Sequence, residues 1–591
     1  MYRSATVVGL SVALTLGSVT GVVAADQARP GAVDLEFNAG AGFGREEGNT
    51  PEIYGDIVGT ETGFLVGGAF DSYRGFDTPG IVAIRNDGSS DPNFRLEVSP
   101  IQIRFGDTLV EFGNNVFAIE PIGNSFYLLG GQFADGDTIK LVDQFGREDP
   151  SFRFEEPPSS GRNGFPDRGF NGFVFDIETV APGVFLVGGQ FSRFSKRPAK
   201  GVARVILGED RVLRLDPTFE SQLNIKDRRR TALRDPMIFT IATRPDDSIL
   251  IGGIFDKYQG EKVGSIAQIS TRGELMSTFE GGARAGRENG QVFSIVQQPN
   301  SPAVVGGSFT SFGSDSAARG LAVLGGQRVR SQAPRLVQAT LGDCVERTDA
   351  TGGAQAVSPV PLEVHKIVPT RNGGYVIAGR FNGLVNLDGS SHNSVGVARL
   401  NSDLTADWTF MDSRGRPGGL FDACPDGSLM PGRGMTIGEL EGERIVAGGF
   451  FNTAFDVQTL RPVNAPNITM LWDTKLEDTA LIPRTPIVPE VKSVSEKELV
   501  DIVFAVSGRA NDQREETWVY RQGEIGTAST EGGPCEIVER VPFDELNPGY
   551  DTVTVQHPPR SGAGTYICAR QVLATNLREL ASDFSYILIE G

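Results

Sequence analysis

Histidine is scarce in this chain of 591 residues, which contains only three. His365, His392 and His557 lie far apart, and no two have the spacing of a metal-binding pair. A histidine-ligated metal centre and a Ser-His-Asp triad are therefore not expected. Phosphate loops and dinucleotide-binding fingerprints are also missing. Carboxylate pairs for sugar hydrolysis cannot be singled out among 74 acidic residues, so we predict no catalytic residue, metal ligand or cofactor.

Positive charge is in the minority, because 55 Lys and Arg face 74 Asp and Glu and leave a net charge of −19. An acidic chain repels phosphate backbones, so we expect no nucleic-acid partner. One basic run stands out, formed by Lys226, Arg228, Arg229 and Arg230. It is a candidate ligand loop for an acidic glycan, although a protease-sensitive loop or a merely solvated loop explains the same residues.

Long apolar runs are missing beyond the first 25 residues. Arg3 precedes a mostly apolar stretch at 7–23, and Val23-Ala24-Ala25 fits a small-residue cleavage site. We predict a signal peptide at 1–25 and a mature start at Asp26. An uncleaved anchor is the alternative, although glycine and threonine interrupt the stretch. After cleavage no transmembrane segment is expected, so we place the protein outside a bacterial cell, at its surface or in the periplasm.

Cysteine is rare as well, and all four lie beyond the predicted signal peptide: Cys344, Cys424, Cys535 and Cys568. An even number in an oxidising compartment permits two disulfides. Spacing alone leaves the three connectivities open.

Glycine and phenylalanine are abundant, with 75 and 37 copies, and both belong to an internal repeat. A short apolar run that ends in two small residues, one variable residue and Phe occurs seven times, and successive copies begin 54 to 72 residues apart. The copies are FLVGGAF at 64–70, YLLGGQF at 127–133, FLVGGQF at 185–191, ILIGGIF at 249–255, AVVGGSF at 303–309, YVIAGRF at 375–381 and IVAGGFF at 445–451.

Each copy has similar neighbours. An alternating segment such as VFDIETV precedes it, another short strand follows, and a fourth strand carries Asp-x-x-Phe, beginning at Asp91, Asp149, Asp216 or Asp407. The apolar run reads as a strand buried on both faces, and the paired glycines permit a close approach of backbones or a bulge. We expect the Asp to cap a turn and the recurrent Phe residues to fill the space between units. Four consecutive short strands describe one blade of a β-propeller.

These units resemble the delta-60 repeat of bacterial secreted proteins, whose pattern includes a Gly-Gly-x-Phe strand end and a closing Asp-x-x-Phe. The resemblance covers roughly residues 30–475 and implies architecture rather than chemistry. We therefore predict an all-β chain with a seven-bladed β-propeller at 26–480. The lone DLEF segment at 34–37 is expected to complete the last blade and close the ring.

Loop lengths predict two unequal faces. Consecutive antiparallel strands alternate in direction, so the loops after strands two and four share a face. The long loops are of these two kinds: 153–172, 220–236, 329–362, 411–433 and 452–467. We expect the ligand on this long-loop face. Cys344 and Cys424 fall in two of these loops, so a bridge between them is compatible with the geometry.

The repeat stops before a linker at 481–490, which contains PRTPIVP. Residues 491–591 resemble a bacterial immunoglobulin-like β-sandwich, with strands near 500–508, 517–523, 551–556 and 564–572. The resemblance implies that Trp518 is the core Trp and Tyr566 the corner Tyr. The first Cys of that pattern is missing, so a Cys535–Cys568 bridge would not be the usual one between the two sheets.

The sequence thus favours a secreted or surface-exposed, non-enzymatic binding or adhesion scaffold whose partner is an extracellular glycan or protein. A polysaccharide-acting hydrolase or lyase that uses acidic residues of the long-loop face is one alternative. A structural component of an envelope assembly is the other.

Overall fold

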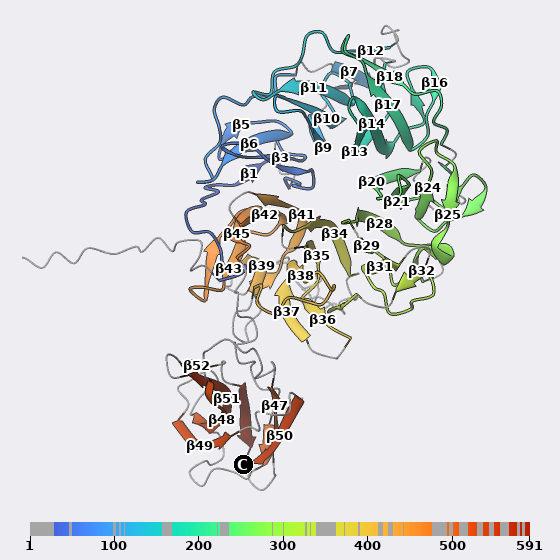
Figure 1. Ribbon diagram of the computed structural model, residues 1–591. Coiled ribbons are helices and arrows are strands. Elements are labelled where there is room, and N and C mark those ends of the chain that lie inside the picture. Colours follow the sequence, from blue (N-terminus) through green and yellow to red (C-terminus); the bar gives the residue numbers. More distant parts are fainter. Residues whose placement is uncertain are drawn as a thin grey trace, which may run out of the picture.

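The computed structural model is almost entirely β-structure (Figure 1). It describes residues 29–474, apart from 46–49, 99–101, 106–107, 112, 156–167, 222, 225–235, 287, 300, 326–327, 331–332, 338–361, 372, 388–390, 412–417, 424–428 and 441–442. Beyond residue 474 it describes the backbone of the strands alone. Across these parts of the chain, no helix has the length and apolar character needed to cross a membrane.

The seven sequence repeats each form a small antiparallel sheet. The first strands are β2 (Ile57–Gly59), β9 (Asn115–Ile122), β13 (Phe173–Ala181), β20 (Met237–Thr243), β28 (Gln291–Val296), β34 (Glu363–Pro369) and β41 (Arg433–Leu440). The second strands, which contain the glycine pairs, are β3 (Gly63–Gly67), β10 (Phe126–Gln132), β14 (Val184–Gln190), β21 (Ile249–Ile254), β29 (Ala303–Ser308), β35 (Tyr375–Arg380) and β42 (Arg444–Phe450). The third strands are β6 (Ile81–Arg85), β11 (Ile139–Asp143), β17 (Val202–Leu207), β24 (Ile266–Ile269), β31 (Leu321–Gly325), β38 (Val397–Leu400) and β45 (Ile468–Trp472).

The sheets follow one another around a common centre, as Figure 1 shows. From β9 to β41, each first strand packs against the first strand of the next unit, and β41 contacts β2. A single pair, Ser308 and Glu363, also joins the fifth and sixth sheets by backbone pairing. The buried second strands fill the space between neighbouring units, with residues such as Phe185, Leu186 and Val187 at most 1% exposed.

The N-terminal segment pairs with the last unit. Val33 forms an antiparallel bridge with Leu471 of β45, and the Asp34 amide donates to the Met470 carbonyl over 2.8 Å. The Trp472 amide donates to the Ala32 carbonyl over 2.9 Å. The N-terminal segment therefore pairs with the last unit and covers an edge of β45 that would otherwise be open, but it does so through residues 31–34. The strand expected at DLEF, 34–37, is a turn in which the Asp34 side chain accepts a hydrogen bond from the Glu36 amide.

Asp-x-x-Phe is a turn, so the prediction of a strand at these residues was wrong. The Asp side chain accepts a hydrogen bond from the amide two residues later, at 3.0 Å in Asp91, 2.8 Å in Asp149, 2.8 Å in Asp216 and 2.9 Å in Asp407. This local bond satisfies the backbone outside the sheet, which is why the strand ends here. The fourth strand lies just before the motif, as in β18 (Val212–Leu215) and β25 (Leu275–Ser277).

The paired glycines have two separate functions in packing. A Cβ on Gly252 would lie 2.5 Å from Val292 Cγ1 of the next unit, so the first glycine permits close approach of the sheets. A Cβ on Gly253 would lie 1.9 Å from the Met237 carbonyl oxygen, where the first strand bulges toward it. Both functions that the sequence predicted, close approach and a bulge, are therefore present.

The loops after strands four and two pair with each other. Unit one joins β1 (Phe43–Gly44) to β4 (Ser72–Tyr73), and unit four joins β19 (Leu223–Asn224) to β22 (Lys257–Tyr258). The same arrangement recurs in the later units, between β26 (Ala283–Ala285) and β30 (Ser311–Phe312), between β33 (Arg335–Val337) and β36 (Gly383–Val385), and between β39 (Gly418–Ala423) and β43 (Thr453–Asp456). Because these two kinds of loop touch, they lie on one face, as the alternating direction of consecutive strands predicted.

The C-terminal part forms two groups of strands. One sheet has the order β46 (Ser493–Ser495), β53 (Ser585–Glu590), β51 (Tyr566–Thr575), β48 (Trp518–Ala528) and β49 (Glu536–Pro542), and the other pairs β47 (Val500–Val506) with β50 (Gly549–Val555). All four predicted strand regions therefore contain strands. The predicted signal peptide at 1–25 and linker at 481–490 lie outside the described residues.

Candidate functional site

A β-bulge recurs in the first strand of six units and places one side chain at the centre of the ring. In the third unit the pairing passes from Val174 to Asp176 and leaves Phe175 unpaired. The residue left out in the other units is Phe117, Phe239, Phe293, His365 or Met435. A bulge turns its extra residue away from the ordinary alternation of a strand. Each of these six side chains is half-buried, and the residue before it is buried.

The bulged side chains and Tyr54 of the first unit form a collar of adjacent rings. Ring centroids are 5.1 Å apart from Tyr54 to Phe117, 5.1 Å from Phe117 to Phe175 and 5.2 Å from Phe175 to Phe239. The series continues at 5.7 Å from Phe239 to Phe293 and 5.1 Å from Phe293 to His365. These separations are those of favourable aromatic pairs. We call Tyr54, Phe117, Phe175, Phe239, Phe293 and His365 the aromatic collar.

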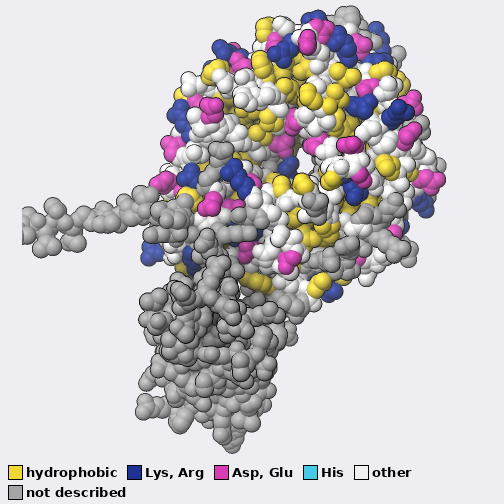
Figure 2. Space-filling view, viewed as in Figure 1, with side chains coloured by type: hydrophobic (Ala, Val, Ile, Leu, Met, Phe, Trp, Pro, Cys, Tyr) yellow, Lys and Arg dark blue, Asp and Glu magenta, His cyan; other side chains and the backbone are white. Residues whose placement is uncertain are grey.

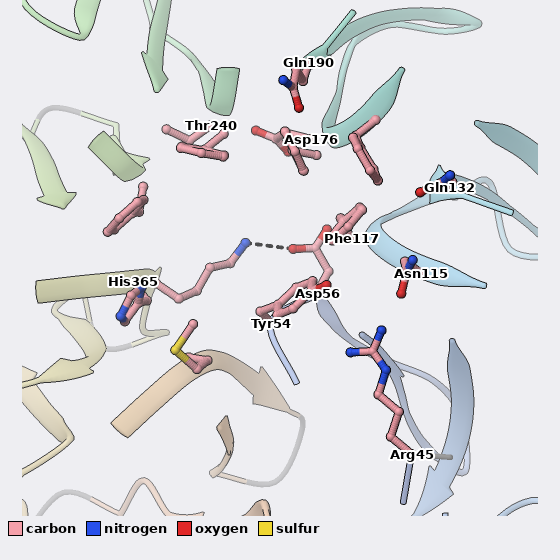
Figure 3. Close-up of a pocket in the computed structure, with 16 residues that line it drawn as sticks. Arg45, Tyr54, Asp56, Asn115, Phe117, Gln132, Asp176, Gln190, Thr240 and His365 are labelled. Carbon is pink, nitrogen blue, oxygen red and sulfur yellow. Dashed lines mark hydrogen bonds and ion pairs between the residues drawn. The ribbon is translucent and has the colours of Figure 1, made fainter. Parts of the chain in front are cut away.

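The collar surrounds a cavity of about 650 Å³ (Figure 3). Met435 completes its wall, and Phe173 adds a further ring. The remaining lining is polar: Arg45, Asp56, Asn115, Gln132, Asp176, Gln190, Thr240 and Lys366. In the space-filling view the described part of the molecule is hollowed at its centre (Figure 2). A cavity of this size that combines aromatic walls with polar groups is typical of ligand-binding sites.

An ion pair crosses this cavity. Lys366 Nζ lies 2.7 Å from Asp56 Oδ1, shown dashed in Figure 3, and both side chains are partly exposed, at 34% and 23%. Asp56 Oδ2 also accepts the Ile119 amide over 3.1 Å. Asp176 Oδ2 accepts the Ile241 amide over 2.6 Å. Ile119 belongs to the unit after that of Asp56, and Ile241 belongs to the unit after that of Asp176. Each carboxyl group is therefore held by a backbone amide of the next unit around the ring.

Burial sets the protonation of these groups. It raises the pKa of Asp176 well above the ordinary value, and the charge of Asp56 adds to this effect. Burial also raises the pKa of Glu120 to about 7, with a contribution from Glu178. The pKa of Lys366 is raised despite burial, because Asp56 and Asp176 lie nearby. The cavity therefore holds a charged lysine paired with Asp56 and one carboxyl group, that of Asp176, that resists ionisation.

The mouth of the cavity lies at the long-loop face. Two residues of a unit lie there: the variable residue of Gly-Gly-x-Phe on the second strand and the residue that pairs with it on the first strand. Gln132 pairs with Asn115 in this way, and Gln190 pairs with Phe173. Both positions adjoin the loops after strands two and four. In these two units the mouth has amides and an aromatic ring. The corresponding positions of the sixth unit are Glu363 and Arg380, and those of the seventh unit are Arg433 and Phe450, whose ring centroid lies 5.6 Å from the Arg433 guanidinium. These four residues are not among those that line the cavity.

None of the residues singled out in the sequence belongs to this site. The candidate ligand loop of Lys226, Arg228, Arg229 and Arg230 lies outside the described residues, as do Cys344, Cys424 and Cys535. Cys568 is placed by its backbone alone, on β51 opposite Gly526 of β48. Both disulfides therefore stay predictions. The signal for the collar was present, because Phe recurs in VFAI, VFDI, IFTI and VFSI. The bulge that points it inward has no separate mark in the sequence.

No protein-family model and no curated protein matches the chain, so its resemblance to the delta-60 repeat stays a prediction. Among solved structures it is similar to a protein of unknown function from Bacteroides caccae, with 14% identity, 58% of this chain and 92% of that chain covered, and a TM-score of 0.29. It is also similar to PorZ, an essential surface component of the type-IX secretion system of Porphyromonas gingivalis, with 9% identity, 87% of this chain covered and a TM-score of 0.23. The match spans 63% of the PorZ chain, which is less than two thirds. Both TM-scores are too low to indicate a shared fold.

Proposed function

We propose that this is a secreted or surface-exposed binding protein, in which a seven-bladed β-propeller holds its ligand in the central cavity on the long-loop side. The C-terminal residues 491–591, an immunoglobulin-like β-sandwich in this proposal, serve as a spacer or second contact. Ring packing from β2 to β41 and closure by the segment around Val33 support the propeller.

The aromatic collar is the observation that supports binding most strongly. Other Phe side chains of the repeat, such as Phe133 and Phe191, are at most 1% exposed, whereas the collar residues are half-buried and line the cavity. Leaving apolar rings in water costs free energy that a ligand would recover, at about 25 cal/mol per Å² covered. Six units repeat the bulge that exposes them, so the exposure belongs to the architecture.

The test is retention of residues 26–591 on a panel of immobilised polysaccharides and cell-surface extracts. We expect retention by the unchanged protein and its loss in Phe175→Ala/Phe239→Ala. Phe76→Ala is the matched control, because Phe76 is 64% exposed and is not among the cavity-lining residues. Retention that survives the collar substitutions but is lost when 338–361 is shortened would overturn the central site.

One observation favours hydrolysis as a second candidate function. Asp56 is ion-paired with Lys366, while burial raises the pKa of Asp176 beside it. Two carboxyl groups in different protonation states are the requirement for acid and base roles in sugar hydrolysis. Release of reducing ends in the same assay, abolished by Asp176→Asn, would establish this candidate in place of simple binding.

A further inference from the structure

We propose that the cavity binds a neutral carbohydrate, a sugar unit with adjacent hydroxyl groups and no net charge. This inference rests on the proposed function and names its ligand class. Three parts of the cavity support it: the walls, the floor and the mouth.

The walls offer flat apolar surfaces on several sides. The collar rings are half-buried, and Phe173 and Phe175 stack nearly parallel, with 7° between their planes. One face of a pyranose ring carries C–H groups and packs on an aromatic ring, while its hydroxyls point outward to polar partners. A ring with an apolar face and a polar edge fits walls of Phe that lead to a polar floor.

The floor provides a donor and an acceptor close together. Asp56 is engaged on both oxygens, by Lys366 and by the Ile119 amide. Within the described part of the chain, Lys366 makes one hydrogen bond, so two of its three N–H groups remain available. Asp176 uses Oδ2 for the Ile241 amide and keeps Oδ1 for a ligand. An ammonium and a carboxyl group beside each other match two adjacent hydroxyls, which each donate and accept.

The charges of the floor disfavour ionic ligands. An anion would approach Lys366, but that cation is already paired with Asp56. An organic cation would compete with the Lys366 ammonium for Asp56, 2.7 Å away. The raised pKa of Asp176, caused first by burial, reduces negative charge further. A ligand without net charge avoids both conflicts.

Three primary amides and Arg45 lie beside this floor. Asn115 and Gln132 lie opposite each other on β9 and β10, and Gln190 occupies the corresponding place on β14. Figure 3 shows these three side chains on the side of the pocket where Asp176 and Phe117 lie. Amides both donate and accept, as hydroxyl-rich ligands require.

The experiment places a reporter in the collar. Phe239→Trp puts an indole in the cavity wall, and its fluorescence is followed during titration with neutral oligosaccharides, oligogalacturonate, spermidine and a mixed-sequence peptide. Calorimetry on the unchanged full chain gives the affinities. We expect neutral oligosaccharides alone to bind, and Phe175→Ala and Lys366→Met each to weaken binding at least tenfold. Phe76→Ala should bind normally.

The outcomes separate the two proposals. Collar-dependent binding of the acidic sugar, the polyamine or the peptide would overturn the carbohydrate class and leave a central binding site. Binding of neutral sugars that Phe175→Ala and Lys366→Met leave unchanged would overturn the cavity as their site. No binding of any probe in either measurement would overturn the inference. Circular dichroism and thermal unfolding of each variant identify loss of binding that comes from misfolding.

Discussion

Lys366 Nζ lies 2.7 Å from Asp56 Oδ1, although 310 residues separate the two along the chain. The pair joins the sixth unit to the first across the central cavity. Removing the lysine leaves Asp56 and Asp176 without their common cation. We expect Lys366→Met to lower the free energy of unfolding by about 1–2 kcal/mol, less than for a fully buried pair because both groups are partly exposed.

Chemical denaturation measures this loss, and Lys262→Met is the matched control. Lys262 lies on β23 (Glu261–Lys262), where both residues are exposed. We expect no more than about 0.5 kcal/mol from the control. Equal losses in the two variants would show that the central pair does not stabilise the ring.

Much of the fold could be predicted from the sequence, because its strands recur with the same pattern. All seven apolar runs contain strands, and the N-terminal segment pairs with β45, although through residues 31–34 and not through DLEF. The prediction of a strand at Asp-x-x-Phe failed for a local reason. A side chain such as Asp91 bonds the backbone two residues on, which closes a turn and ends the pairing.

The site was harder to predict, because it depends on the bulges and on contacts between units. A strand that alternates regularly would give Phe175 and Asp176 opposite sides, yet the bulge lets both line the cavity. His365 was interpreted as an isolated histidine, and it is the sixth member of the collar. Lys366 carried no signal, since its partners come from units one and three.

Because of Glu120, we expect the stability of the protein to depend on pH. Burial raises its pKa from 4.5 to about 7, and its carboxylate accepts the Thr179 amide over 3.2 Å. Between these pKa values the unfolded chain ionises while the folded protein keeps the proton. The contribution of Glu120 to stability is therefore complete below pH 4.5 and falls as pH rises toward 7.

Glu120→Gln cannot ionise and should lose less stability over this range. We expect it to exceed the unchanged protein by about 1–2 kcal/mol at pH 8, after allowance for solvent screening, and to equal it near pH 4. Glu61→Gln, at an exposed position, is the control and should follow the unchanged protein throughout. Parallel pH profiles for Glu120→Gln and the unchanged protein would contradict the raised pKa.

At the first glycine of each pair we expect the stability effects of substitutions in neighbouring units to be coupled. A Cβ on Gly252 meets Val292 Cγ1 at 2.5 Å, so Gly252→Ala should cost about 1–3 kcal/mol through overpacking. The sixth unit has Ala378 at this place, and the seventh unit has Gly434 where the others carry Val or Ile. Where the first glycine is replaced by the larger Ala378, the residue that faces it in the next unit is thus the smaller Gly434.

A double-mutant cycle tests this pairing. We expect Gly252→Ala to cost less in the Val292→Gly background than alone, with an interaction energy of at least about 0.5 kcal/mol. Gly260→Ala is a useful comparison, because a Cβ there meets no atom within 4 Å, although its φ of +89° disfavours alanine by itself. Additive losses at Gly252 and Val292 would show that the two positions do not share the space.

In two units an arginine of the third strand pairs with the Asp of Asp-x-x-Phe, and this ion pair gives the last prediction. Arg399 on β38 is 2% exposed and bonds Asp407 at 2.7 Å and Asp473 at 2.5 Å, whereas Arg85 on β6 is 41% exposed and bonds Asp91 alone at 3.1 Å. Arg399→Met leaves two buried carboxylates without a partner cation, so we expect a loss of about 3–5 kcal/mol. Arg85→Met leaves its acid in contact with water and should cost less than about 1 kcal/mol. Denaturant midpoints of the two variants check this difference. Similar midpoints would mean that burial does not decide the strength of this ion pair, because both units join an arginine of the third strand to the Asp of Asp-x-x-Phe.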